Sequence, residues 1–425
     1  MIGKGIAGFE KGSPYQTFPQ FDNVKTIVAE GKYTVVFKLS APAPLLIENL
    51  GLVDHIKMIP REVVDKHGNL DDWRNAVGTG PFILHDYVSG SQVLFRKNPD
   101  YWGYDELHPE NKLPYADYIR QFIINDASTS LAAFRTGKVD VRAVQWTEAG
   151  SLRKSNPELI WKKNPVVSIV LAMRNDKPPF DNIKVRKALQ MAMNLPEIAE
   201  EYYGGNTLGW FPPIIGPGLT DYWTPFEEYP REVRDGFTYN VAGAKALLAE
   251  AGLGGGFRTE IVTSPYMPND LVELAQSYLK DIGVTMDIVN MDFNKWTTFV
   301  YGKQHQAMAV HMSGLQGNPL DALRFYYPGM SWNLANVNDA SFTKMVDDVT
   351  NEGNLVKRNA MIKQAVYYGT SQFWVVRLPI YVEYAAWYPW LTNYQGENGL
   401  GVYNPGGVWA RISLDQEMKN EMTGR

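Results

Sequence analysis

The sequence predicts an α/β protein in which one domain is built from two separate stretches of the chain. Paired strand patterns fill roughly the first 165 residues, strand and helix patterns alternate over 166–382, and short strands and turns return after Trp387. Alternation of that length implies right-handed crossovers and a mainly parallel sheet. We therefore expect the chain to cross between two domains twice, near 165–173 and near 380–387.

Hairpins dominate the first region. Alternating apolar and polar residues predict paired strands over 24–28 and 33–39, then over 82–87 and 91–96. A strand over 119–124, a helix over 127–135 and a strand over 139–144 follow. Asp126 or Ser128 is expected to cap that helix and Gly137 to end it.

The second region alternates between strands and helices. The apolar run 166–173 is typical of a strand buried on both faces. Asn240 is expected to cap a helix that Gly252 ends. Further strands are expected over 259–263, 284–289, 306–311 and 378–382. Helices are expected from Ile183, from Pro196, and over 241–251, 270–281, 294–301, 340–350 and 355–373.

Composition excludes several classes of function. The 425-residue chain carries 41 basic and 46 acidic residues, a formal net charge of −5. A general nucleic-acid binder would normally show a basic excess or stripe, so we expect no nucleic-acid partner. The absence of cysteine excludes disulfides, thiolate metal sites and thiol catalysis. No apolar run reaches the roughly 18 residues that a membrane span needs.

Two patterns suggest enzymatic chemistry, but weakly. Ser151 and Lys154, like Ser341 and Lys344, match the S-x-x-K spacing of serine acyl-enzymes, in which the lysine deprotonates the serine. Both segments are typical of surface helices, and no convincing S-D-N or K-T-G partner motif accompanies them. A hydrolase is therefore kept only as an alternative, together with one that uses a pair of carboxylates.

His305 and His311 flank a short predicted strand, so they point to one side if that strand is continuous. Nickel or metal-chelate binding by this pair is a further alternative. No histidine pair has the i, i+4 spacing of a helical zinc site, and we expect no resident metal or cofactor.

Aromatic residues make up 13% of the chain. Flat aromatic faces give contact area without charge, which suits sugar rings or apolar side chains. Most should nevertheless be core residues. The candidates are Tyr384, Trp387, Tyr388 and Trp390 at the second crossing, and Trp146, Trp210, Trp223, Phe293 and Trp296 elsewhere.

Short motifs in a fixed order resemble one known family, the extracytoplasmic solute-binding proteins of the dipeptide, oligopeptide and nickel group (family 5), which feed ABC importers. The resemblance covers nearly the whole chain. Its motifs are VGTGPF at 77–82, FRKNPDYWG at 95–103, LPYAD at 113–117, AFRTGKVD at 133–140, KPPFDNIKVRKAL at 177–189 and AKALLAEAG at 244–252.

The resemblance implies a periplasmic-binding-protein-like two-lobed clamp with hinge strands. Residues 1–76 would be the remainder of an extra subdomain of lobe I, 77–168 lobe I, 169–383 lobe II and 384–425 the return to lobe I. It also implies a monomer that has no catalytic residues, works with an ABC permease and is periplasmic or lipid-anchored. The family's signal peptide and first strands have no counterpart here, so an N-terminally truncated chain is expected.

The resemblance also directs attention to the ligand. Peptide binders of this family pair the peptide ammonium with an Asp, where this chain has Leu315, and Met312 replaces a Trp. Phe293 falls where the family has a pocket Trp. Arg174, on the first hinge strand, either meets a ligand carboxylate or pairs with Glu383. Oligopeptide and oligosaccharide therefore remain equal hypotheses. The expected ligand-binding residues are Trp146, Arg174, Phe293, His311, Met312, Leu315, Gln316, Asn318, Tyr384 and Trp387.

Overall fold

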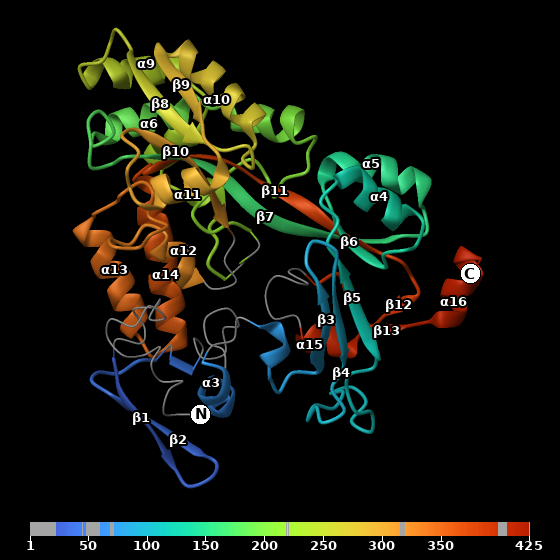
Figure 1. The fold of residues 1–425 in the computed structure, drawn as a ribbon. Coiled ribbons are helices and arrows are strands. Elements are labelled where there is room, and N and C mark those ends of the chain that lie inside the picture. The colour runs from blue at the N-terminus through green and yellow to red at the C-terminus, as the bar shows by residue number, and fades with distance from the viewer. Residues whose placement is uncertain are drawn as a thin grey trace. The chain divides into compact units, whose positions relative to one another are not determined.

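The computed structural model describes residues 23–44, 46–47, 60–68, 72–217, 219, 221–314, 319–397 and 406–424 (Figure 1). The chain divides into two compact units. Unit 1 consists of Met1–Asn164 and Tyr384–Arg425, and unit 2 of Pro165–Glu383. Both units contain helices and strands, which confirms the predicted α/β class. Leu315, Gln316 and Asn318 lie outside the described residues.

Unit 1 contains an antiparallel sheet in the order β3 (Phe82–Val88), β4 (Gln92–Lys97), β5 (Tyr118–Phe122). A separate hairpin joins β1 (Val24–Glu30) to β2 (Thr34–Leu39). Gly31 and Gly90 adopt positive φ values of 73° and 72° in the two hairpin turns, a conformation that glycine adopts without steric cost. In the sequence between the β1–β2 hairpin and β3 lie α3 (Arg61–His67) and a short 3-10 turn, Trp73–Asn75.

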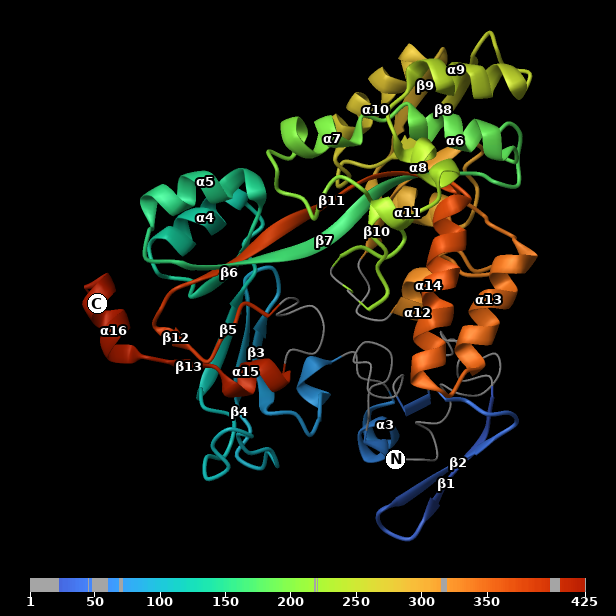
Figure 2. The same cartoon turned by 180° about the vertical axis from the view of Figure 1, so that it is seen from behind.

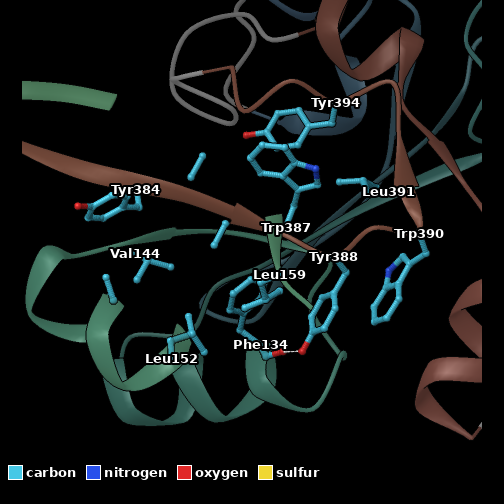
Figure 3. Close-up of a cluster of buried hydrophobic side chains, with 13 residues drawn as sticks. Phe134, Val144, Leu152, Leu159, Tyr384, Trp387, Tyr388, Trp390, Leu391 and Tyr394 are labelled. Atoms are coloured by element: carbon cyan, nitrogen blue, oxygen red, sulfur yellow. Dashed lines mark hydrogen bonds between the residues drawn. The ribbon is translucent and has the colours of Figure 1, made fainter. Parts of the chain in front are cut away.

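In the rest of unit 1, elements from the middle of the chain pack with residues from its end. α4 (Ala127–Arg135), β6 (Val141–Val144) and α5 (Trp146–Ser155) pack with residues that follow Glu383 in one hydrophobic cluster (Figure 3). Asp126 caps α4 by accepting a hydrogen bond from the Thr129 amide, as predicted. The buried members of this cluster are Phe134, Val144, Ala149, Leu152, Leu159, Tyr384, Ala385, Ala386, Trp387, Tyr388, Trp390, Leu391 and Tyr394.

The prediction of short strands and turns at the end of the chain was incomplete. Besides the short strands β12 (Leu391–Thr392) and β13 (Ser413–Leu414), this part of the chain contains α15 (Gly406–Arg411) and α16 (Gln416–Thr423). Glycine at the start of α15 and the low apolar content of α16 hide the helical period. The Asp415 side chain caps α16 by accepting a hydrogen bond from the Met418 amide.

Two long strands carry the chain between the units. β7 (Ile160–Met173) begins in unit 1 and continues into unit 2, and β11 (Val375–Trp387) runs back. Both are longer than predicted. The mixed sequence IWKKNP at 160–165 extends β7 ahead of the apolar run 166–173, and β11 includes Arg377 and Glu383 on either side of 378–382. Besides β6, the other strands of this sheet are β8 (Phe257–Thr263), β9 (Val284–Asn290) and β10 (Met308–Gly314).

The sheet is mixed, which corrects the prediction of a mainly parallel one. Its order is β6-β11-β7-β10-β8-β9. β8 is parallel to β9 and to β10, as strand–helix alternation requires. β10 is antiparallel to β7, and β11 is antiparallel to β6. Strand–helix alternation indicates parallel neighbours only for consecutive crossovers, and β7 precedes that series.

Helices of unit 2 begin at capping side chains. α6 (Ile183–Met191), α9 (Val241–Glu250), α11 (Phe293–Tyr301), α13 (Ala340–Asn351) and α14 (Leu355–Ser371) start after Asn182, Asn240, Asp292, Asp339 and Asn354. Each cap accepts a backbone N–H. α13 and α14 lie side by side in both views (Figure 2). The remaining helices are α7 (Leu195–Glu197), a π-helical turn (Ile198–Tyr202), a 3-10 turn (Phe226–Glu228), α8 (Arg231–Phe237), α10 (Asn269–Asp281) and α12 (Pro319–Arg324).

Gly256 lies in close backbone contact with the neighbouring strand. A Cβ atom on Gly256 would lie 2.0 Å from the carbonyl oxygen of Gly283, just before β9. Glycine at position 256 therefore permits the start of β8 to lie against the start of β9.

Tyr388 offers a test of the cluster in unit 1. Its ring stacks on Trp390 at 4.0 Å, and its hydroxyl donates to the carbonyl oxygens of Phe134 and Arg135 at 2.7 and 3.1 Å. Tyr388→Phe removes that donor from a buried site. We expect a loss of about 1–3 kcal/mol in the free energy of unfolding, measured by urea denaturation. The exposed Tyr33→Phe is the control, and an equal loss in both variants would contradict the assignment.

Candidate functional site

An exposed aromatic pair lies where two parallel strands of unit 2 end. Because β8, β9 and β10 run parallel, their carboxyl ends meet at one edge of the sheet. In open α/β sheets this edge is where ligands bind. Tyr266 follows β8, and Phe293 follows β9; their ring centroids are 5.0 Å apart at 69°.

Local hydrogen bonds fix the backbone that carries each ring. After β8, the Asn269 side chain donates to the carbonyl oxygen of Ser264 at 3.0 Å and accepts from Thr263 at 2.9 Å. Met267 is buried in this turn, whereas its neighbour Tyr266 is 74% exposed. After β9, Asp292 caps α11 by accepting the amides of Asn294 and Lys295, which places Phe293 in the first helical turn.

A buried ring supports the exposed pair. Phe293 is 40% exposed, and its other neighbour is Trp296, 6.0 Å away and inclined by only 14°. Trp296 is buried and contacts Tyr301 edge-on. The pair therefore forms an exposed apolar surface in which Phe293 is supported from below by a buried ring. We call Tyr266, Phe293 and Trp296 the aromatic platform.

Two other predicted site residues lie on β10. Met312 is partly exposed, whereas His311 is buried between the rings of Tyr301 and Phe325, at 5.9 and 4.9 Å. His311 Nδ1 lies 2.8 Å from the carbonyl oxygen of Met312 and therefore donates to it. Its Nε2 atom has no hydrogen-bond partner among the described residues. Burial lowers the pKa of His311 to about 4, so the ring is neutral at pH 7.

Arg174 lies beyond the opposite edge of the sheet. It follows Met173, which pairs with the first residue of β10, so Arg174 is at the amino edge of β10. Its guanidinium forms two bonds to Asp176, at 2.7 and 2.6 Å, and donates to the carbonyl oxygens of Lys303 and His305. Hydrogen bonds from Arg174 lower the pKa of Asp176 to about 2. The bidentate partner of Arg174 is thus a carboxylate of the protein itself.

His305 and His311 do not converge on one site. His305 precedes β10, is fully buried and has its Nε2 atom 2.9 Å from the carbonyl oxygen of Leu334. Burial lowers its pKa to about 4. Within the part of the chain that the structure describes, no group of three His, Asp or Glu side chains could hold a metal ion.

Three aromatic members of the expected ligand-binding set belong to unit 1. Tyr384 and Trp387 are buried in its hydrophobic cluster (Figure 3). Trp146, the first residue of α5, packs against that cluster. Packing accounts for the apolar faces of Tyr384 and Trp387. The expected site residues are therefore divided between core and surface, which aromatic type alone does not distinguish.

The S-x-x-K motifs take part in ordinary helix contacts. The Ser151 hydroxyl donates to the carbonyl oxygen of Glu148 at 3.0 Å and accepts from Arg135 at 3.1 Å. Lys344 forms an ion pair with Asp348, one turn further along α13, at 2.6 Å. These contacts do not resemble a serine activated by its lysine.

Tyr266 was missed by sequence reasoning. The sequence offers one signal, since Tyr266 comes directly after the predicted strand 259–263 in a turn that contains two prolines. Residues in turns at the carboxyl edge of a parallel sheet are good candidates for ligand contact.

Comparisons with known proteins agree with this architecture. The family profile described as "Bacterial extracellular solute-binding proteins, family 5 Middle" matches residues 4–335. Di/tripeptide-binding protein 1 of Pseudomonas aeruginosa is 27% identical over 382 residues, covering 84% of this chain and 67% of the relative. Across three such curated relatives, the chain spans about half to two thirds of their length.

Solved structures share the fold. The periplasmic binding protein DppA of Helicobacter pylori, in complex with the peptide STSA, has a TM-score of 0.75 at 20% identity, covering 97% of this chain and 77% of that one. AgaA of A. tumefaciens R10, in complex with agropinic acid, has a TM-score of 0.76 at 19% identity, covering 98% and 83%. In the described part of this chain, the helices lack the length and apolar character that crossing a membrane requires.

The two buried histidines predict how stability changes with pH. Their folded pKa values, about 4, lie below the ordinary 6.5, so the unfolded chain binds more protons between these values. Their contribution should be present above pH 6.5 and decline as the pH falls toward 4, by at most about 1.4 kcal/mol per pH unit for each ring.

Urea unfolding at pH 7 and pH 5 measures this loss. His311→Phe keeps the ring between Tyr301 and Phe325 and should reduce the difference between the two pH values. The exposed His108→Gln on unit 1 is the control. An unchanged pH dependence in His311→Phe would contradict the assignment of a neutral buried ring.

Proposed function

Because the chain belongs to the bacterial extracellular solute-binding proteins of family 5, we propose that it is the extracytoplasmic binding component of an ABC importer and that its ligand is an oligopeptide. In this proposal the protein is a non-enzymatic monomer, periplasmic or lipid-anchored, that delivers its ligand to a membrane permease. The aromatic platform is the observation that supports the proposal, because it offers partly exposed aromatic rings at the carboxyl edge of the sheet, where a ligand can bind.

Peptide is preferred to oligosaccharide for two reasons. Relatives over most of this chain are named for di- and tripeptides, and a structural neighbour is named for its complex with a peptide. The platform itself suits an apolar peptide side chain as well as a sugar ring, because both can pack on an aromatic face. An oligosaccharide stacked on the same rings is the alternative outcome of the test.

One stretch of the sequence offers no carboxylate that could pair with the peptide's ammonium group. The stretch 311–320 contains neither Asp nor Glu, and Leu315 stands where peptide binders that the chain resembles have an Asp. Burying an ammonium without a partner costs several kcal/mol. We therefore propose that side chains and backbone of the peptide, rather than its amino terminus, provide most of its affinity.

A thermal-shift screen tests the ligand class. Di- to hexapeptides with apolar side chains are compared with cello-, xylo- and chito-oligosaccharides. At a hundredfold excess over its dissociation constant, a true ligand should stabilise the protein by about 2.7 kcal/mol. Peptides are expected to raise the melting temperature; a shift with sugars alone would replace the peptide proposal with the oligosaccharide alternative.

Phe293→Ala tests where the peptide binds. Loss of the central ring of the platform should weaken binding of the best peptide by about tenfold or more, measured by isothermal titration calorimetry. Phe122→Ala in β5, which removes a comparably exposed phenylalanine of unit 1, is the control. Equal affinities of Phe293→Ala and the unmodified chain would exclude the platform as the binding site.

Acetylating the peptide's amino group tests the missing ammonium partner. Affinity should change by less than about threefold, because no buried ion pair is lost. A loss of about a hundredfold on acetylation, measured with the same peptide, would show that an ammonium anchor exists.

A further inference from the structure

The loop between β4 and β5 has a structure that ligand binding does not explain. Residues 98–117, here called the acidic loop, project from one end of the three-stranded sheet of unit 1 (Figure 1). They include the NPDYWG and LPYAD motifs. The loop presents two large apolar side chains to solvent: Trp102 is 73% and Leu107 is 86% exposed. Tyr104 is exposed as well.

Internal hydrogen bonds hold the loop in this form. The Leu113 amide donates to the Gly103 carbonyl at 3.0 Å, and the Asp105 amide donates to the Asn111 carbonyl at 3.0 Å. The Tyr115 hydroxyl donates to Asp105 at 2.7 Å. These bonds make a small hairpin whose apolar side chains are displayed by an ordered backbone.

The acidic loop is also anchored to the rest of unit 1. The Tyr115 amide donates to the Ala410 carbonyl in α15 at 2.9 Å, and Arg411 forms an ion pair with Glu106 at 3.3 Å. The Tyr101 ring lies over Gly103, where an added Cβ would come within 2.6 Å of it, and contacts Trp102 at 5.4 Å. These contacts hold the loop around Trp102, while the Trp102 side chain stays exposed.

The charge of the loop indicates what it binds. Five carboxylates accompany a single lysine, Lys112, whose ammonium donates to the Pro99 carbonyl at 2.8 Å. The carboxylates are those of Asp100, Asp105, Glu106, Glu110 and Asp117. Exposed tryptophan is typical of the centre of a protein interface, and an acidic rim favours a basic partner. A second copy of the loop or an anionic membrane surface would be repelled.

We propose that the acidic loop is a docking element for a protein partner with an apolar pocket rimmed by lysine or arginine. Given the proposed function, on which this identification of the partner rests, that surface belongs to the extracytoplasmic face of the importer's membrane permease. Trp102 and Leu107 enter the pocket, and the exposed Glu110 meets its basic rim.

The first experiment identifies the partner by photo-crosslinking. The full chain is produced in cells with p-benzoylphenylalanine in place of Trp102, or in place of the still more exposed Tyr33 in the β1–β2 hairpin as the control. Position 102 should form an adduct with a permease subunit, identified by mass spectrometry, and position 33 should not. An adduct with another class of protein or with lipid overturns the proposal, and so does the absence of any adduct.

The second experiment separates docking from ligand binding. Trp102→Ser/Leu107→Ser should lower cellular uptake of a labelled peptide about tenfold or more, whereas Tyr33→Ser should leave it within about twofold. The purified double variant should keep the parent's melting temperature and peptide affinity. Unchanged uptake, or Trp102-dependent binding to anionic vesicles, overturns the proposal. If the purified parent binds no peptide, the proposed function fails, and the crosslinking result still decides the docking.

Discussion

Backbone pairing along β7 and β11 is the constraint on which the rest of the structure depends. Each of these strands has residues in both units, and the six-stranded sheet is built on them. β7 pairs with β10 from Met173↔Met308 to Val167↔Gly314, and β10 then orders β8 and β9. β11 changes partners along its length. Up to Val382 it bonds to residues 206–208, and from Tyr384 it pairs with β6, with Glu383 between the two pairings.

This arrangement gives the two edges of the sheet in unit 2 different roles. At the amino edge of β10, Arg174 joins Asp176 to the carbonyl oxygens before the strand, so the charged groups there satisfy one another. At the carboxyl edge, aromatic rings are exposed and supported from below. A buried charge requires a partner, whereas an exposed apolar surface has little electrostatic cost in the absence of a ligand.

The sequence predicted most elements of unit 2, because their apolar periods and Asn or Asp caps are strong local signals. Asn240, for example, caps its helix as expected, accepting the Gly243 amide at 2.8 Å. The site was harder to predict. Trp387 and Phe293 look alike in sequence, yet one is buried in a core cluster and the other partly exposed. The antiparallel β7–β10 pairing was also not predicted, because strand order depends on contacts between residues far apart in the chain.

The support beneath Phe293 has an entropic consequence. A ring stacked on the buried Trp296 has already lost most of its rotamer freedom before any ligand arrives. Tyr266 is more exposed, and ordering it on binding costs about 0.5–1.5 kcal/mol. In the proposed binding mode the two rings therefore contribute unequally, with Phe293 as the preorganised ring and Tyr266 as the adjustable one. That mode predicts that ligands of different shape share the contact with Phe293 and differ in their contact with Tyr266.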